Sequence, residues 1–331
     1  MNRKTIRRAA AAFATAVFVA LAAAAQAPPG DEAEAAQEAQ EGEPTGPVGQ
    51  FSEQLSVSWV LVPVLVRSDD GYVEGLEKDA FRLWVDDERV PVVDFESGAT
   101  APVSLVFLQD LSGSMANADK LTASKQALAY LLSRARPDDE FALASFAGGR
   151  LQVEVPFTRD AQVLAEAMEL WTGWGTTAIH DAVAWIPRIV VEGRHPKRAA
   201  VLVSDGLDNA SELSAEDARE VVRRAQLPVY VLEIRQLGDL QAAVPSDSYA
   251  LLLKELARST GGRYFAVRPD DGIAEAAAGL LEELRRQYVL AFPTQPGEID
   301  YRRLKVEVDA PGHVTIYHRR GYRGGLPGAA R

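Results

Sequence analysis

The sequence predicts an α/β protein in which a doubly wound, mostly parallel sheet is inserted into a small, discontinuous β-sandwich domain. Two observations indicate this fold class. In the middle of the chain, strand-like stretches alternate with stretches of helical spacing, which is typical of parallel strands joined by right-handed crossovers. On both sides of that segment, short strand-like stretches follow one another with turn signals between them and no helix of useful length.

The central strands and helices are assigned from the spacing of apolar residues. The apolar run at 103–108 suits a strand that is buried on both faces. Further strands are expected at 141–146, 151–155, 199–203, 229–234 and 263–267. Helices are expected at 120–133, 160–170, 179–191, 215–225, 249–259 and 273–287. Ligands of this architecture bind beyond the carboxyl ends of the strands, where the strand order reverses.

The flanking strands form two groups of three. They are expected at 57–66, 81–85 and 90–95 before the central segment, and at 288–292, 304–308 and 314–318 after it. Neither group alone makes a stable sheet with two good faces, whereas together they suffice for one sandwich. We therefore predict an α/β domain over 100–287, inserted into a β domain that is built from 51–99 and 288–323.

The two ends of the chain are predicted to lie outside these domains. A basic start, an apolar run at 9–25 and small residues up to Ala27 predict a secretory signal peptide over 1–27, with an uncleaved anchor as the alternative. The acidic segment 28–50 is too polar to pack and is predicted to be a disordered linker; a tail follows at 324–331. The protein is expected to be exported to the periplasm or the extracellular space, with no stable membrane span after cleavage.

The composition excludes some classes of function. The chain has 331 residues, 35 Lys and Arg against 47 Asp and Glu, and a formal net charge of −12. A cationic nucleic-acid binder is not expected from that balance. There is no Cys, so the fold cannot depend on disulfides, and the lack of Cys and of paired His argues against a zinc site.

Side chains with oxygen atoms lie in three loops at the predicted ends of strands. Asp110, Ser112 and Ser114 alternate directly after the strand at 103–108, Thr177 precedes the helix at 179–191, and Asp205 follows the strand at 199–203. In a parallel sheet these loops converge on one edge. Hydroxyl and carboxylate oxygens are hard ligands that suit Mg²⁺, Mn²⁺ or Ca²⁺.

This arrangement resembles the von Willebrand factor A-type (VWA) domain, a Rossmann-like fold with a metal-ion-dependent adhesion site. The Asp-x-Ser-x-Ser motif of that family is complete as Asp110, Ser112 and Ser114. Its threonine corresponds best to Thr177, with Thr176 as a competitor, and its third-loop aspartate corresponds to Asp205. The flanks are similar to the VWFA-related Acidobacterial domain family through 73–81 before the domain and Tyr288, 314–318 and 320–322 after it.

The resemblance implies a site for a partner rather than for turnover. In this family the serines and the threonine or third-loop oxygens hold a divalent cation, and a partner protein supplies an Asp or Glu carboxylate that completes the metal shell. The family also implies a shift of its last helix, here 273–287, between weakly and strongly binding states. We therefore expect a metal-dependent interaction module that is not an enzyme.

Less specific interpretations exist for each of these residues. Asp110, Ser112 and Ser114 can cap the helix that follows them, Thr177 can cap the helix at 179–191, and Asp205 can be a turn residue. His180 at the start of a helix is expected to be structural, because no nucleophile is paired with it in the sequence. Trp171 and Trp174 can present an aromatic surface or pack beneath the second loop.

Two alternative functions remain open at this stage. A Mg²⁺-dependent phosphatase-like hydrolase would use Asp110 as its phosphoryl acceptor, although Ser112 stands where a second Asp would support that chemistry. The stretch 111–115 is not a Gly-x-Ser-x-Gly nucleophile turn, and no phosphate-binding Gly-rich motif follows the first central strand. The second alternative is a scaffold that keeps the fold and binds no metal.

Overall fold

The computed structural model describes residues 58–98, 101–117, 119–206, 208–225, 227–235, 246–294 and 300–323. All of them belong to one compact unit that begins at Gln54. The predicted signal peptide at 1–27, the linker at 28–50 and the tail at 324–331 lie outside the described residues. Within the described ranges, no helix has both the length and the apolar character needed to cross a membrane.

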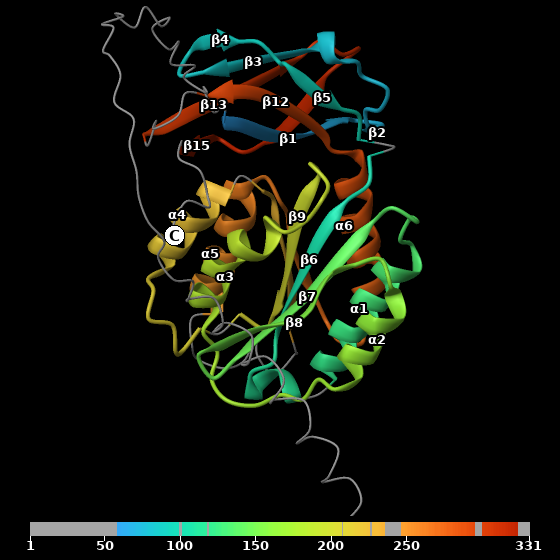
Figure 1. Ribbon diagram of the computed structural model, residues 1–331, viewed down its shortest axis with the longest axis vertical. Helices are drawn as coiled ribbons and strands as arrows, with labels where there is room; N and C mark the ends of the chain where they lie inside the picture. Colours follow the sequence, from blue (N-terminus) through green and yellow to red (C-terminus); the bar gives the residue numbers. More distant parts are fainter. Residues whose placement is uncertain are drawn as a thin grey trace, which may run out of the picture. The chain divides into compact units, whose positions relative to one another are not determined.

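A six-stranded sheet forms the centre of the unit, in the order β11-β10-β9-β6-β7-β8 (Figure 1). Every neighbouring pair is parallel except β7 and β8, which are antiparallel. The chain moves outward from β6 in one direction and then restarts on its other side with β9, so the strand order reverses between β6 and β9. The strands are β6 (Ser104–Asp110), β7 (Glu140–Ala147), β8 (Arg150–Thr158), β9 (Arg198–Ser204), β10 (Val229–Ile234) and β11 (Tyr264–Val267).

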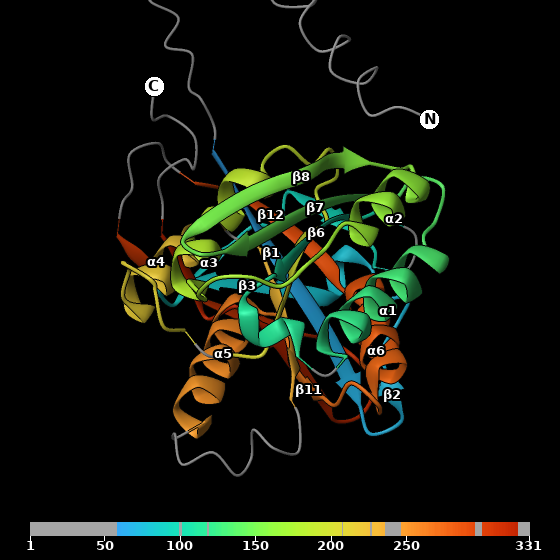
Figure 2. The same ribbon diagram turned by 90° about the horizontal axis from the view of Figure 1, so that it is seen from below.

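Among the described residues, six α-helices cover this sheet, three on each face (Figures 1 and 2). One face packs against α1 (Lys120–Ser133), α2 (Ala161–Glu169) and α6 (Ile273–Arg286). The other packs against α3 (Ile179–Val190), α4 (Ala215–Ala225) and α5 (Ser246–Thr260). This is a doubly wound α/β fold, in which helices connect most of the strands and a tight turn joins β7 to β8.

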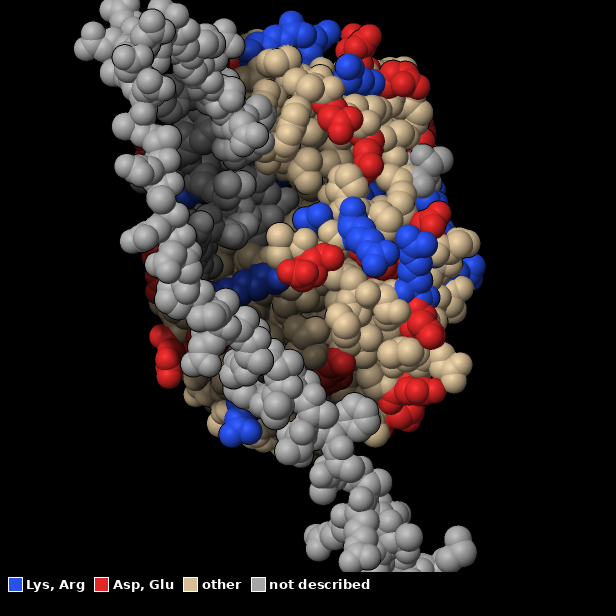
Figure 3. Space-filling model, viewed as in Figure 1, with Lys and Arg blue, Asp and Glu red and all other residues tan. Residues whose placement is uncertain are grey.

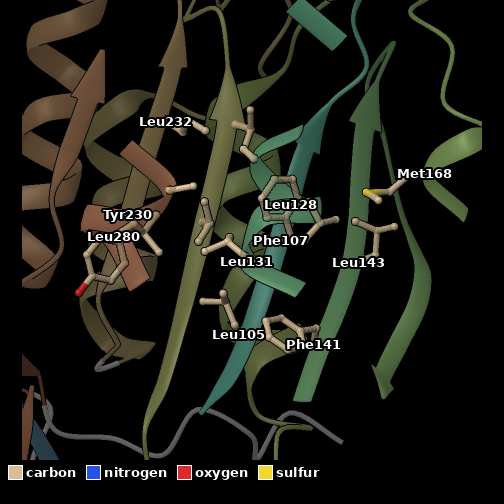
Figure 4. Packing of buried hydrophobic residues seen from close by; sticks show 14 of the residues in the cluster. Leu105, Phe107, Leu128, Leu131, Phe141, Leu143, Met168, Tyr230, Leu232 and Leu280 are labelled. Atoms are coloured by element: carbon tan, nitrogen blue, oxygen red, sulfur yellow. The ribbon is translucent and has the colours of Figure 1, made fainter. Parts of the chain in front are cut away.

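Strand β6 shows why the sheet is buried on both sides. All seven of its residues are buried. Leu105 and Phe107 pack into the cluster beneath α1 and α6, whereas Val106 and Leu108 belong to the cluster beneath α3. Successive side chains of a strand point to opposite faces, so a continuous apolar run is what two covered faces require. Figure 4 shows Leu105 and Phe107 beside the side chains of α1.

Strands from both ends of the chain pair with each other in two further sheets. One has β1 (Ser58–Ser68), β2 (Gly71–Tyr72), β5 (Asp94–Glu96), β12 (Tyr288–Thr294) and β14 (Val314–His318). The other has β3 (Phe81–Val85), β4 (Glu88–Val90), β13 (Tyr301–Val308) and β15 (Gly321–Arg323). All these pairings are antiparallel. A single hydrophobic cluster takes Val62 and Leu290 from the first sheet and Leu83 and Val306 from the second.

The structure corrects two details of the predicted flanks. The segment 90–95 was expected to be one strand, but β4 ends at Val90 and β5 begins at Asp94, and the two strands lie in different sheets. Pro91 lacks a backbone N–H, so it cannot continue a ladder, and the chain changes sheets there. The short strand β15 was not predicted, because Gly321–Arg323 is too short to show any periodicity.

Candidate metal centre

Three loops meet at the carboxyl end of the central sheet. The first follows β6 and contains the short helix η3 (Gly113–Ala116), the second connects α2 to α3, and the third follows β9. In Figure 1 this end of the sheet lies at the bottom, opposite the flanking sheets, and Figure 2 views the molecule from that side. The loops therefore lie at the switch point between β6 and β9, where doubly wound sheets bind their ligands.

The first loop holds a fully buried carboxylate beside two hydroxyls. Asp110 Oδ1 accepts a hydrogen bond from the backbone N–H of Ser112 at 2.8 Å, and Asp110 Oδ2 accepts one from Ser204 Oγ at 2.6 Å. The hydroxyls of Ser112 and Ser114 lie 3.1 Å apart. Burial raises the pKa of Asp110 to about 6, and the charge of Asp205 raises it as well. Asp205 therefore lies close enough to Asp110 to affect the pKa of Asp110.

Backbone hydrogen bonds fix the second loop against the first. The N–H of Gly113 donates to the carbonyl of Gly175 at 3.0 Å, and the N–H of Trp174 donates to the carbonyl of Leu111 at 2.7 Å. The neighbouring Gly173 lies so close to the first loop that an added Cβ would stand 2.7 Å from the Cβ of Ala116. This close approach requires glycine at position 173 and allows the second loop to pack directly against the first.

The third loop is in turn bound to Thr177. Asn209 accepts a hydrogen bond from the backbone N–H of Thr177 through Oδ1 and donates its own N–H to the carbonyl of Thr177, each at 3.0 Å. Thr177 is buried, whereas Thr176 is exposed. The three loops that carry the predicted ligands are thus joined, and Thr177 is the threonine that faces inward.

Asp205 completes the set of predicted side chains and has a cationic neighbour. Its Oδ2 accepts a hydrogen bond from Lys120 Nζ at 3.0 Å, and both side chains are at most 5% exposed. Among the described residues, Asp205 Oδ1 is buried and has no hydrogen-bond partner. A buried carboxylate oxygen without a partner is costly, and a bound cation would satisfy it. The donor set therefore fits a hard divalent ion.

The donors at this site are hydroxyls as much as carboxylates. Within the part of the chain that the structure describes, no three His, Cys, Asp or Glu side chains gather in a group that could hold a metal ion. Two carboxylates with Ser and Thr hydroxyls suit Mg²⁺, which is bound by few carboxylates and keeps open positions for water or another ligand.

The geometry supports the capping interpretation for Asp110, which accepts the backbone N–H of Ser112, but not for Ser112 or Thr177. Ser112 precedes η3 but makes no side-chain capping hydrogen bond, and the residue that caps α3 is Ala178 rather than Thr177. Lys120, Ser204 and Asn209 were not among the predicted site residues. Lys120 shares the helical spacing of buried Ser124, Leu128 and Leu131, so a buried lysine was visible in principle.

The aromatic residues of the second loop have separate roles. Trp171 is buried, stacks on Phe107 with ring centroids 6.4 Å apart, and donates its indole N–H to Glu154 at 2.7 Å. Trp174 is 49% exposed beside the first loop. His180 Nδ1 donates a hydrogen bond to the carbonyl of Leu213 at 3.1 Å, so it connects α3 to the loop before α4. Trp171 and His180 each connect neighbouring segments through these hydrogen bonds, and Trp174 is half-exposed on the surface.

Comparison with known proteins identifies the domain. Residues 105–207 match the model of the von Willebrand factor type A domain. The chain therefore contains a VWA domain, a type of module that generally mediates protein interactions rather than catalysis.

Solved structures of low sequence identity resemble parts of the chain. A von Willebrand factor type A protein from Catenulispora acidiphila is 15% identical, with 80% of this chain and 73% of that chain covered and a TM-score of 0.48. An aerotolerance-related membrane protein from Bacteroides fragilis is 21% identical, with 55% and 98% covered and a TM-score of 0.42. The von Willebrand factor domain of the type V pili tip protein Mfa5 from Porphyromonas gingivalis is 13% identical, with 55% and 95% covered and a TM-score of 0.44.

Proposed function

We propose that this chain is an exported interaction protein whose VWA domain binds a divalent cation and uses it to capture a carboxylate of a partner protein. The metal ligands are Asp110, Ser112, Ser114, Thr177 and Asp205, bound directly or through water. The cation is Mg²⁺, with Mn²⁺ or Ca²⁺ as substitutes. When bound, it offers one open coordination position to an Asp or Glu side chain of the partner.

The observation that carries this proposal is the buried oxygen of Asp205. Asp205 Oδ1 has no hydrogen-bond partner among the described residues, and it belongs to the same three-loop cluster as the paired hydroxyls of Ser112 and Ser114. A cluster that served only to shape the loops would satisfy its buried oxygens internally. The residues around it support the ligands, because Ser204 and the N–H of Ser112 hold both oxygens of Asp110 in place.

The flanking sheets are proposed to form one discontinuous β-sandwich domain, built from 51–99 and 288–323, that carries the VWA domain of 100–287. The support is the pairing of β1 with β12 over seven residue pairs and the hydrophobic cluster that both flanking sheets share. Export is proposed from the signal peptide predicted at 1–27. In this arrangement the metal centre lies at the end of the VWA domain that faces away from the sandwich.

Metal binding is tested by calorimetric titration of the full chain with Mg²⁺ and Mn²⁺. Asp110→Ala and Ser112→Ala are expected to weaken binding at least tenfold, because each removes a ligand or its charge. Ser133→Ala is the matched control, since Ser133 lies exposed at the end of α1 and donates to the carbonyl of Tyr130 in its own helix. An absence of binding by the unmodified chain, or equal binding by all variants, would contradict the proposal.

Partner capture is tested with the same variants. Beads that carry the full chain are expected to retain a partner from the native envelope or medium in Mg²⁺ and to release it on chelation, and Ser112→Ala beads are expected to retain none. Retention that is identical with and without chelator would remove the carboxylate mechanism. Metal-dependent hydrolysis of a phosphate ester that is abolished by Asp110→Ala would instead support the phosphatase alternative.

A further inference from the structure

A buried lysine lies within the candidate metal centre. Lys120 Nζ is 3.0 Å from Asp205 Oδ2, and the exposed fractions of the two side chains are 5% and 2%. Eighty-five positions separate the two residues in the sequence, so the contact is made by the fold. The pair therefore brings a positive charge to the same cluster that is proposed to bind a cation.

The position of Lys120 is unfavourable for its helix. Lys120 is the first residue of α1, and the first turn of this helix contains no acidic residue. The N-terminal end of a helix carries a partial positive charge and favours acidic side chains. A lysine at this position therefore does not stabilise α1. Its contact with Asp205 is explained better by a role in the site.

The charges of the cluster can be counted in each state. When these three side chains are ionised, Asp110 and Asp205 contribute two negative charges and Lys120 one positive charge, so the three together carry −1 without metal. A divalent cation changes this to +1, and a partner carboxylate then makes it neutral. Without Lys120, the same states would carry −2, 0 and −1. Buried charges interact strongly, so these differences determine what the site binds.

We propose that Lys120 sets the selectivity of the metal centre: its ammonium group weakens metal binding and makes the metal-loaded site cationic, so that the loaded site favours a carboxylate of the partner. This inference rests on the proposed function, because it concerns the same site. Lys120 thereby couples the two binding steps, since the positive charge that opposes the metal attracts the partner group.

The first test measures metal affinity of the full chain by calorimetry with Mg²⁺. Lys120→Met removes the charge and keeps a side chain of similar length, and it is expected to raise the Mg²⁺ affinity at least tenfold. Lys125→Met is the matched control on the same helix, because Lys125 is partly exposed and pairs with the surface residue Glu169. Lys125→Met is expected to leave the affinity unchanged. Lys120→Gln is a second neutral variant if Lys120→Met fails to fold.

The second test measures carboxylate binding to the metal-loaded chain. Acetate is the probe, acetamide is its uncharged control, and the relaxation of water protons by bound Mn²⁺ reports displacement of metal-bound water. The unmodified chain is expected to bind acetate about tenfold more tightly than Lys120→Met does, and neither is expected to bind acetamide. A purely structural Lys120 would leave this ratio at one.

The outcomes separate the inference from the proposed function. Equal Mg²⁺ affinities for the unmodified chain and both neutral variants would overturn the role of Lys120 and leave the metal site standing. No binding by any of them would overturn the metal site, and the inference with it. Binding by the neutral variants alone would support the charge effect of Lys120 and contradict metal binding by the unmodified chain.

Discussion

The two ends of the central sheet each contain a buried lysine, and the two lysines have different partners. At the carboxyl end, Lys120 contacts the carboxylate of Asp205 at 3.0 Å. At the amino end, Lys197 directly precedes β9 and donates to the backbone carbonyls of Gly98 and Arg285, each at 2.9 Å. A carboxylate balances a buried charge, whereas carbonyl groups only solvate it. At the carboxyl end the lysine therefore changes the net charge around the carboxylates. At the amino end the lysine joins separate segments of the chain.

The amino end joins the VWA domain to the flanking sheets. Gly98 lies just after β5, and Arg285 lies in the last turn of α6, directly before β12. Lys197 thus connects the two places where the chain passes between the flanking sheets and the central sheet. Burial lowers the pKa of Lys197 to about 7, and the nearby Arg136 lowers it as well.

This junction is also basic on its surface. Figure 3 shows Lys and Arg side chains gathered at about mid-height of the molecule. A cavity of about 420 Å³ at the junction is lined by Arg134, Arg136, Arg285 and Arg286, together with Glu74 and Glu282. The contrast teaches that the end with two buried carboxylates, Asp110 and Asp205, is the one suited to a cation, and that the basic end serves the connection between the central and flanking sheets.

The largest expected effect comes from Gly98→Ala at the amino end. An added Cβ would lie 2.6 Å from the backbone carbonyl groups of Arg286 and Gln287, which cannot move independently of α6 and β12. We expect a loss of about 3 kcal/mol in the free energy of unfolding, with unchanged Mg²⁺ affinity. Chemical denaturation measures the first quantity and calorimetry the second.

Gly279→Ala is the matched control in α6 itself. Its added Cβ would meet Phe265 at an ordinary 3.5 Å, and alanine favours the helix, so this variant is expected to gain about 0.5 to 1 kcal/mol. If Gly98→Ala were as stable as the unmodified chain, the chain segments that cross at the amino end would not be tightly packed. The amino end would then not be a structural junction in the way that the comparison requires.

The next effect concerns the pH dependence of stability through Lys197. Its pKa is about 7 in the folded protein and 10.5 in the unfolded chain, so between these values the unfolded chain binds the additional proton. The contribution of Lys197 to stability therefore rises with pH, by about 2 kcal/mol between pH 7 and pH 9. Lys197→Met should remove this rise, and Lys125→Met should keep it. Denaturation curves at both pH values give the comparison; parallel behaviour of the two variants would refute it.

The smallest effect is expected at the carboxyl end from Ser204→Ala. Ser204 donates to Asp110 Oδ2 at 2.6 Å and accepts the N–H of Gly206 at 3.1 Å, so it orients a proposed ligand without being one. Its loss should weaken Mg²⁺ binding about tenfold, equivalent to about 1.4 kcal/mol. Ser133→Ala again serves as the control. An unchanged affinity would show that Asp110 is held in place by its other contacts.

The sequence predicted those features that depend on local pattern. The buried run of β6, the alternation of strands and helices and the Asp110, Ser112 and Ser114 motif are all visible within short windows, and the family match at 105–207 confirms the VWA domain. The ligand set itself stays a prediction.

Contacts between residues that are far apart in the sequence could not be predicted from such local patterns. Lys120 and Asp205 become neighbours only through the fold, and Ser204 bonds Asp110 across two adjacent strands. Periodicity identifies Lys120 as a residue on the inner face of a helix but does not reveal its partner. The change of sheet at Pro91 was missed because the apolar character continues across it.

The most direct test of the central claim is a crystal structure of the full chain soaked in Mn²⁺, with anomalous diffraction recorded for the metal. We predict one strong anomalous peak among Asp110, Ser112, Ser114, Thr177 and Asp205, at about 2.2 Å from the hydroxyl oxygens that bind it directly. An anomalous map without a peak between these loops, at a Mn²⁺ concentration that saturates other VWA metal sites, would contradict the account.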